Sequence, residues 1–476
     1  MSPTAVLVTT LAYFAAMILV SRLSSRNKDG RDVFYDGGKK SHWTTVAFAM
    51  IGSCMSGVTF ISVPGMVGTS GFGYLQMCIG FILGYLVIAF VLTPLYFRLN
   101  VVSVYQYLDN RFGTVSYRIG AWFFFLSKML GASVRLYLVC LTLQLLLFGP
   151  MGLPFWLNVV CNVAICLAYT FRGGVKSVIW TDMLKTLCMI VAVVFCVVVV
   201  GRDLGDVRIH EKVFWFDDIN HPQYFWKQLL GGLFTVVAMT GLDQDMMQRT
   251  LTCKNDRDSQ KNLIVSSLLQ TVVIALFLWL GALLYRFAAV HGIPETGDAL
   301  FPAVATGGFL PRIAGVLFVL GLVSCAYGAG GAALTSLTTS FTVDILGKGK
   351  DTKTRKCVHL MMAATMAVTI LVFNALNSTS AIDAVYKLAS YTYGPILGLF
   401  AFGILTRKPV KDRFVPFVAL AAPILCLILQ LNSERWFSGY QFSYELLLMN
   451  AGLTFIGLCC LIRRGGPGRR EPASRQ

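Results

Sequence analysis

The stretch SCAYGAGGAALTSLTTSFTVDI, residues 324–345, combines small residues, hydroxyl residues and a terminal carboxylate. Gly328, Gly330 and Gly331 fall within four residues, and such a glycine density disfavours a helix in a water-soluble protein. In a lipid bilayer, small residues instead let a helix pack closely against its neighbours. The stretch therefore predicts a membrane helix in close contact with other helices, and it ends at Asp344.

The composition places the whole chain in a membrane. The 476 residues are 56% hydrophobic and 13% charged, with a mean hydropathy of +0.68. Soluble domains contain roughly 25% charged residues. The net charge of +17 comes from Lys and Arg in short loops between apolar runs, a distribution that sets membrane orientation. We therefore expect the lipid bilayer and a small polar solute as partners, and no nucleic acid.

Cysteine and histidine give no sign of a metal site or of disulfides. The 13 cysteines are scattered through apolar segments without CxxC spacing, which is typical of reduced, buried thiols. The sequence offers no nucleophile–base pair and no set of metal ligands. It therefore predicts that the protein is not an enzyme, has no cofactor, and binds no metal beyond a coupling sodium.

Apolar runs of about 20 residues can cross a bilayer as helices. The chain has about thirteen such runs, and we predict an all-α membrane protein from them. The predicted spans are 4–22, 43–67, 73–97, 117–147, 153–171, 178–201, 226–249, 263–290, 312–345, 358–377, 384–405, 414–431 and 443–462.

Basic loops alternate with loops poor in Lys and Arg. The basic connections follow the first, seventh and eleventh spans, and the tail 463–476 is also basic. The positive-inside rule then places the N-terminus outside and the C-terminus in the cytoplasm. We expect a multi-pass protein of a bacterial inner membrane, as a monomer or weak oligomer.

Two of the predicted spans contain helix-breaking or polar groups. Gly52, Gly57 and Pro64 interrupt the second span, and the polar run 240–245 interrupts the seventh. Broken spans at corresponding positions of two halves are typical of the substrate site of transporters. The alternative is a pair of packing kinks in an ordinary helix bundle.

The two breaks lie five spans apart and predict two five-helix repeats in a single transporter domain. The expected parts are an extra N-terminal helix and loop at 1–42, repeats at 43–201 and 226–405, two further helices at 414–462, and the tail 463–476.

Five motifs occur in order along spans two to eleven. They are SGVTFISVPG (56–65), TPLYFRLNVVSVYQYLDNRFG (93–113), YTFRGGVKSVIWTD (169–182), LDQDMMQR (242–249) and FTVDI (341–345). With these motifs the chain resembles the sodium:solute symporter family of sodium-coupled sugar, sialic-acid, proline and pantothenate carriers. The resemblance implies a LeuT-type 5+5 inverted repeat and alternating access, with solute and ions between the two broken helices and the ninth span.

The resemblance also implies where a coupling sodium would bind. Backbone carbonyls of the first broken helix map to Gly52 and Met55, and the facing positions on the ninth span map to Cys325, Gly328 and Ala329. Typical members of the family carry a serine pair where this chain has Gly328 and Ala329. Sodium prefers hard oxygen ligands. The loss of these hydroxyls argues against sodium coupling.

The second sodium site of the family also lacks its hydroxyl ligands in this chain. Its hydroxyl positions map to Gly331 and Ala332, and its aspartate maps to Asp182. Four positions that carry hydroxyls in the family thus carry none here. Residues 325, 328, 329 and 332 share one helical face, so the missing ligands form a continuous row.

Lys185 stands where the family usually has Gln, three residues after Asp182 and on the same helix face. One hypothesis is that its ammonium neutralises Asp182 or extends to the vacant cation position, as a fixed charge or as a site of proton coupling. The alternative is that Lys185 snorkels to the cytoplasmic edge of the membrane.

The resemblance to sialic-acid-type carriers implies a set of substrate residues. Its motif positions map to Ser56 and Thr59 on the first broken helix, and to Phe72 and Gln76 on the next span. On the second broken helix, the region that contacts sugars in the sugar carriers contains Thr240, Asp243 and Gln244. An aromatic pair common in hexose carriers is absent.

The fourth span carries two basic residues on one face, Lys128 and Arg135. An arginine inside a membrane span is a candidate functional residue, and its planar fork suits a carboxylate. The sequence leaves two interpretations open for Arg135: it binds an anionic solute, or it pairs structurally with Asp243 or Asp245.

The sequence thus predicts a secondary active transporter of a small polar organic solute, such as a sugar or sugar acid. The family resemblance indicates that transport is coupled to sodium. The residues at the sodium positions instead favour coupling to protons, or no coupling, as in a facilitator. A substrate sensor that has lost transport is the alternative from another functional class.

Overall fold

The computed structural model describes residues 2–25, 41–99, 103–170, 175–205, 214–221, 223–348, 351–376, 381–437, 440, 442 and 444–463. The predicted basic loop at 26–40 and the basic tail from residue 464 onward lie outside the described residues, as do residues 171–174 of the third motif. Within the described ranges the chain is helical, and its β-pairing is limited to two isolated bridges, Ser41 with Cys253 and Val410 with Ile462.

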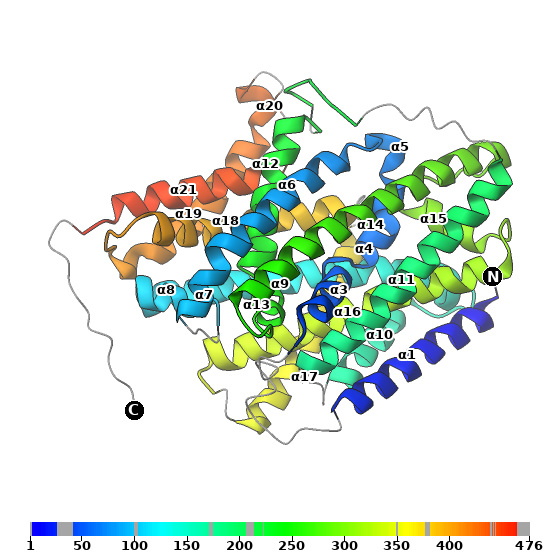
Figure 1. Cartoon of the computed structure of the whole chain (residues 1–476), viewed down its shortest axis with the longest axis horizontal. Helices are drawn as coiled ribbons and strands as arrows, with labels where there is room; N and C mark the ends of the chain where they lie inside the picture. The colour runs from blue at the N-terminus through cyan, green and yellow to red at the C-terminus, as the bar shows by residue number, and fades with distance from the viewer. Residues whose placement is uncertain are drawn as a thin grey trace.

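Nine described helices are long and apolar enough to cross a membrane. These spans belong to α1 (Pro3–Ser25), α6 (Tyr74–Val87) with its continuation into α7 (Thr93–Leu99), α9 (Thr114–Leu143), α11 (Val175–Leu204), α14 (Asp256–His291), α16 (Arg312–Ser340), α17 (Thr352–Leu376), α18 (Ala381–Leu405) and α19 (Val415–Leu431). α1 and α21 (Leu446–Cys460) lie at opposite sides of the bundle (Figure 1).

Two further spans are bent helix pairs, which raises the number to eleven. The shorter apolar helices α10 (Phe155–Thr170) and α21 coincide with the fifth and thirteenth predicted spans. Every predicted span therefore has a helical counterpart, but thirteen crossings remain a prediction because α10 and α21 are short.

The first bent pair joins α3 (Trp43–Cys54) to α4 (Gly57–Gly65) at 62°. Met55 and Ser56 between them adopt extended backbone conformations. Ser56 starts α4 with a capping box, in which its side chain bonds to the backbone of Thr59 and its own backbone N–H donates to Thr59 Oγ1. The chain thus stops one helix and starts another inside a single apolar run.

The second bent pair joins α12 (Phe225–Val236), through the π-helical turn η4 (Val237–Gly241), to α13 (Gln244–Thr250) at 75°. Asp243 is extended and caps α13 by accepting from the backbone N–H groups of Asp245 and Met246. The prediction of two interrupted spans is confirmed by these bends.

The 324–345 stretch is helical throughout, as α16 followed by the π-helical turn η6 (Phe341–Ile345). α16 packs against α9, α10, α11 and α17, so it lies inside the bundle. At its end the Asp344 carboxylate accepts hydrogen bonds from the Tyr117 hydroxyl at 2.8 Å and from Ser340 at 3.0 Å.

Gly52 brings α3 against α11. A Cβ at this position would lie 2.6 Å from the backbone oxygen of Asp182, closer than real Cβ contacts. Only glycine permits this approach, which sets the end of α3 beside the carboxylate of Asp182.

Candidate functional site

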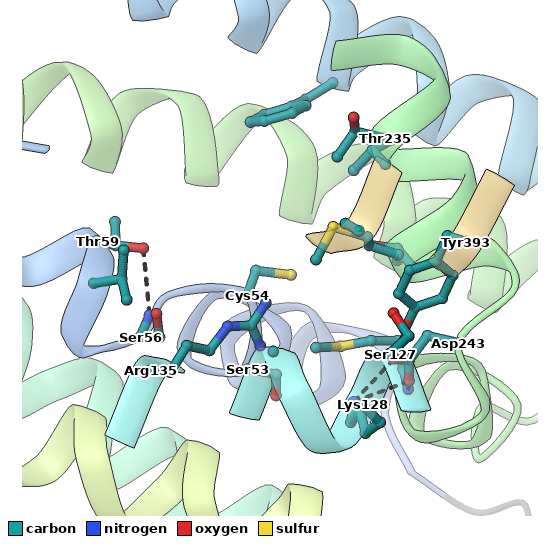
Figure 2. A pocket seen from close by; sticks show the side chains of 18 of the residues that line it. Ser53, Cys54, Ser56, Thr59, Ser127, Lys128, Arg135, Thr235, Asp243 and Tyr393 are labelled. Carbon is teal, nitrogen blue, oxygen red and sulfur yellow. Dashed lines mark hydrogen bonds and ion pairs between the residues drawn. The ribbon is translucent and has the colours of Figure 1, made fainter. Parts of the chain in front are cut away.

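A cavity lies between the two broken helices, and its walls also include α6, α9, α14 and α18 (Figure 2). The lining is part apolar and part polar, as is usual for solute sites. Its hydroxyl and charged residues are Ser53, Ser56, Thr59, Tyr74, Tyr85, Ser127, Lys128, Arg135, Thr235, Thr240, Asp243 and Tyr393.

Five of the eight predicted substrate residues line this cavity, namely Ser56, Thr59, Arg135, Thr240 and Asp243. They come from both broken helices and from α9, segments that are far apart in the sequence. The structure therefore brings together groups that the sequence could relate only through the family pattern.

The other three predicted substrate residues lie elsewhere. Phe72 packs against the apolar core, and Gln76 is fully buried, with Nε2 donating to the backbone oxygens of Gly73 and Gln223. The Oε1 atom of Gln244 accepts the backbone N–H of Val104 at 2.7 Å. These contacts explain why the side chains of Gln76 and Gln244 do not face the cavity.

Lys128 pairs with the carboxylates of the second broken helix. Its Nζ donates to Asp243 Oδ2 at 2.9 Å and lies 3.4 Å from Asp245 Oδ2. Tyr393 from α18 also donates to Asp243, at 2.9 Å. The structural pairing considered for Arg135 with Asp243 or Asp245 is thus made by Lys128 instead, because Lys128 lies two turns earlier on α9.

Arg135 is half-buried and extends from α9 into the cavity near Cys54 (Figure 2). Within the described part of the chain it makes no ion pair. The two carboxylates considered as its partners, Asp243 and Asp245, bond to Lys128 and Arg249 instead. Its guanidinium therefore faces the cavity without an opposite charge from these residues.

Arg249 joins the site as a buried residue that the sequence analysis did not assign. Its Nη1 donates to Asp182 Oδ2 at 2.7 Å and to Ser53 Oγ, and its Nη2 lies 3.1 Å from Asp245 Oδ1. The sequence signal for this role was that Arg249 lies four residues after Asp245 in the LDQDMMQR motif, a spacing that allows an ion pair on a helix. Arg249 thereby connects the second broken helix to α3 and α11.

Lys185 is fully buried in the protein, and its stem lies against α16 where Gly328 leaves room. A Cβ on Gly328 would lie 2.7 Å from Lys185 Cδ and 3.5 Å from its Nζ. Snorkelling to the membrane edge does not describe this buried side chain. Neither Lys185 Nζ nor Asp182 Oδ1 has a hydrogen-bond partner among the described residues.

Tyr169 lies against Gly331, a position to which the family resemblance maps a ligand of the second sodium site. Its hydroxyl donates to the backbone oxygen of Tyr327, and a Cβ on Gly331 would overlap this hydroxyl. Nothing in the sequence indicated this contact, because Tyr169 lies on α10, far from α16 in the chain.

The buried charges around the cavity are balanced. Three carboxylates, Asp182, Asp243 and Asp245, face the three cations Lys128, Arg249 and Lys185. The cluster is neutral when Lys185 carries its proton. The positive charge of Arg135 is then an excess charge at the cavity wall.

Two broken helices that meet at a polar, partly charged cavity inside a bundle of membrane spans define a secondary transporter of small solutes. The chain belongs to the sodium:solute symporter family, whose model matches residues 34–411. The family consists of transporters, so the prediction that the protein is a transporter and not an enzyme is confirmed.

The relatives are carriers of similar length or longer. The chain is 24% identical to the human sodium/iodide cotransporter, over 82% of this chain and 65% of that protein. It is 27% identical to the sodium/sialic acid symporter NanT of Aliivibrio fischeri, over 87% of this chain and 86% of that protein. The bacterial sialic acid symporter, together with the many apolar helices, supports a multi-pass protein of an inner membrane.

A solved structure of a sodium-coupled sialic acid symporter, substrate-bound and outward-open, has the same fold. It aligns with a TM-score of 0.79 at 20% identity, covering 96% of this chain and 97% of that chain. The predicted LeuT-type fold is confirmed by this likeness and by the two bent pairs.

Proposed function

We propose that this protein carries a small organic anion, such as a sugar acid, and that the ammonium group of Lys185 takes the place of the coupling sodium. The observation that carries the proposal is the contrast between two cations of the site. Among the described residues Arg135 has no ion-pair partner and faces the cavity, whereas Lys185 fills the space beside Gly328.

The anionic class of the solute follows from charge. A guanidinium on a cavity wall inside a membrane protein is costly unless an anion meets it, and its fork binds a carboxylate through two hydrogen bonds. The names of the two relatives above refer to iodide and sialic acid, which are both anions. Ser56, Thr59 and Thr240 supply hydroxyls for the remainder of a polar solute.

The residues at the first family sodium site do not fit the ion. Gly328 and Ala329 offer no side-chain oxygen, and Lys185 brings a positive charge to the same face of α16. A cation beside a buried ammonium is repelled strongly because the surroundings have a low dielectric constant. We infer that sodium is not the coupling ion and that protonation of Lys185 either drives transport or is permanent.

Ligand binding to the purified full-length protein tests the proposed solute class. We expect sugar acids and sialic acid to raise the melting temperature, whereas their neutral amides do not. Arg135→Gln should weaken anion binding about tenfold to a hundredfold, as expected when a charge-assisted hydrogen bond is lost. Arg118→Gln, an exposed site on the same helix, is the matched control. Equal binding of neutral and anionic solutes would contradict the proposal.

Uptake into proteoliposomes separates the coupling modes. Uptake that depends on pH in the native protein, and no longer does in Lys185→Gln, supports proton coupling. An unchanged pH dependence in the variant excludes it, and binding without flux would favour a sensor. We also propose that the C-terminus lies in the cytoplasm and that the protein is a monomer or a weak oligomer.

A further inference from the structure

A second cavity lies at a basic end of the bundle, between the end of the α6–α7 span, α8 (Gln106–Arg111) and the end of α18. Its volume is about 430 Å³. Its lining includes apolar residues such as Phe90, Val91 and Ile404, which form the apolar wall of the groove, and three arginines, Arg98, Arg111 and Arg407.

The apolar wall faces outward from the protein. The exposed fractions of Phe90, Val91 and Ile404 are 59%, 44% and 36%. In a membrane protein, outward-facing side chains of this kind contact the acyl chains of lipids. The groove therefore combines outward-facing apolar side chains with positively charged ones.

Arg111 connects α8 to the end of α18. Its Nε donates to the backbone oxygen of Gly403 at 3.2 Å, and its Nη2 donates to those of Thr406 at 2.8 Å and Lys408 at 3.1 Å. These bonds fix α8 against the end of α18. They bind Arg111 only to carbonyl oxygens, so its positive charge is not neutralised by them.

Arg98 and Arg407 are exposed, and neither forms an ion pair with a carboxylate in the described part of the chain. Arg98 is the penultimate residue of α7, and Arg407 follows α18 by two residues. Three guanidinium groups thus line one groove without an acidic side chain among its lining residues.

We propose that this groove binds an anionic phospholipid. Its phosphate would lie between Arg98 and Arg407, with Arg111 behind, and its acyl chains would follow Phe90, Val91 and Ile404. Basic pockets between membrane helices are suited to anionic lipid head groups, and arginine binds phosphate through paired hydrogen bonds. Free phosphate would leave the apolar wall unused, so the structure favours a lipid. The bound lipid would connect α7 with the end of α18.

The test uses the purified full-length protein and dioleoyl phosphatidylglycerol, with dioleoyl phosphatidylcholine and inorganic phosphate as comparison ligands. Native mass spectrometry counts the bound lipid, and the melting temperature gives an apparent affinity. The variant is Arg98→Gln with Arg407→Gln. The matched control is Lys408→Gln with Arg413→Gln, which removes the same charge from exposed side chains outside the groove.

We expect phosphatidylglycerol to bind saturably to the native protein and to the control, and about 30-fold more weakly to the Arg98/Arg407 variant. Each single variant should lose about fivefold, which keeps the test valid if the double variant folds poorly. Equal losses in variant and control would show diffuse attraction and overturn the proposal. Equal effects of phosphatidylcholine or of free phosphate would overturn it as well.

Discussion

The side chain of Lys185 passes the point on α16 where Gly328 lacks a side chain, with Cδ 2.7 Å and Nζ 3.5 Å from the position of a Cβ there. The two residues lie on α11 and α16. The family pattern places the ligands of its first sodium site on the first broken helix and α16, and those of its second on α11 and α16. The lysine and the glycine therefore depend on each other: a larger residue at 328 and the buried ammonium compete for one space.

This relationship predicts how sodium binding could be introduced. Replacing Lys185 by Gln, together with Gly328→Ser and Ala329→Ser, removes the ammonium and supplies two hydroxyls. We expect sodium, and not potassium, to stabilise this triple variant, by about 2.7 kcal/mol at a hundred times the dissociation constant. The measurement is the melting temperature in sodium against potassium.

The matched control is Gly328→Ser with Ala329→Ser and Lys185 retained. Because the ammonium remains, this variant should show no sodium-specific shift, and overpacking beside Lys185 should cost about 1–3 kcal/mol. A sodium-specific shift in the native protein would refute the proposed role of Lys185.

Arg249→Gln should destabilise the protein strongly. The substitution leaves Asp182 and Asp245 buried without their shared guanidinium, and breaking a buried ion pair in this way costs about 3–5 kcal/mol. Unfolding in detergent by denaturant measures the loss. Arg257→Gln, at an exposed arginine in the first turn of α14, should change stability by less than about 0.5 kcal/mol. Similar effects of both substitutions would show that the buried network contributes little.

Lys128 and Asp243 should be energetically coupled. In a double-mutant cycle with Lys128→Gln and Asp243→Asn, each single variant leaves one buried charge without its partner, so we expect an interaction energy of about 1–3 kcal/mol. The exposed pair His291 and Asp203, 3.6 Å apart, serves as the control and should give a value close to zero. Additive effects at Lys128 and Asp243 would disagree with the observed ion pair.

Gly52→Ala should weaken the contact between α3 and α11. The added methyl group would lie 2.6 Å from the backbone oxygen of Asp182, and a backbone atom cannot move aside as a side chain can. We expect a cost of about 1–3 kcal/mol. Gly452→Ala in α21 meets no atom within 4 Å and should be neutral or stabilising. Thermal unfolding of the two variants in parallel makes the comparison, and equal stability of both would contradict the close approach.

Much of the fold could be predicted because membrane spans and their interruptions are local features. Runs of apolar residues mark the spans, and the breaks at Met55–Ser56 and at Asp243 lie where glycine and polar residues interrupt them. The order of the motifs, which depends on sequence alone, then identified the family.

The partners of the charged side chains were decided by tertiary structure. Lys128 and Arg135 lie on one face of α9, and the sequence could not show which of them reaches Asp243. Arg249 bonds to Asp182, 67 residues away, through a side chain that no periodicity relates to it.

The sequence by itself determined that residues 325, 328, 329 and 332 of α16 carry no hydroxyl, because this depends only on residue identity. Only the tertiary structure decided what occupies the space that these residues leave: Lys185 from α11 beside Gly328, and Tyr169 from α10 against Gly331. The physical reason is that the absence of a side chain follows from one residue's identity. The group that fills the free volume depends on which helix packs there in the fold.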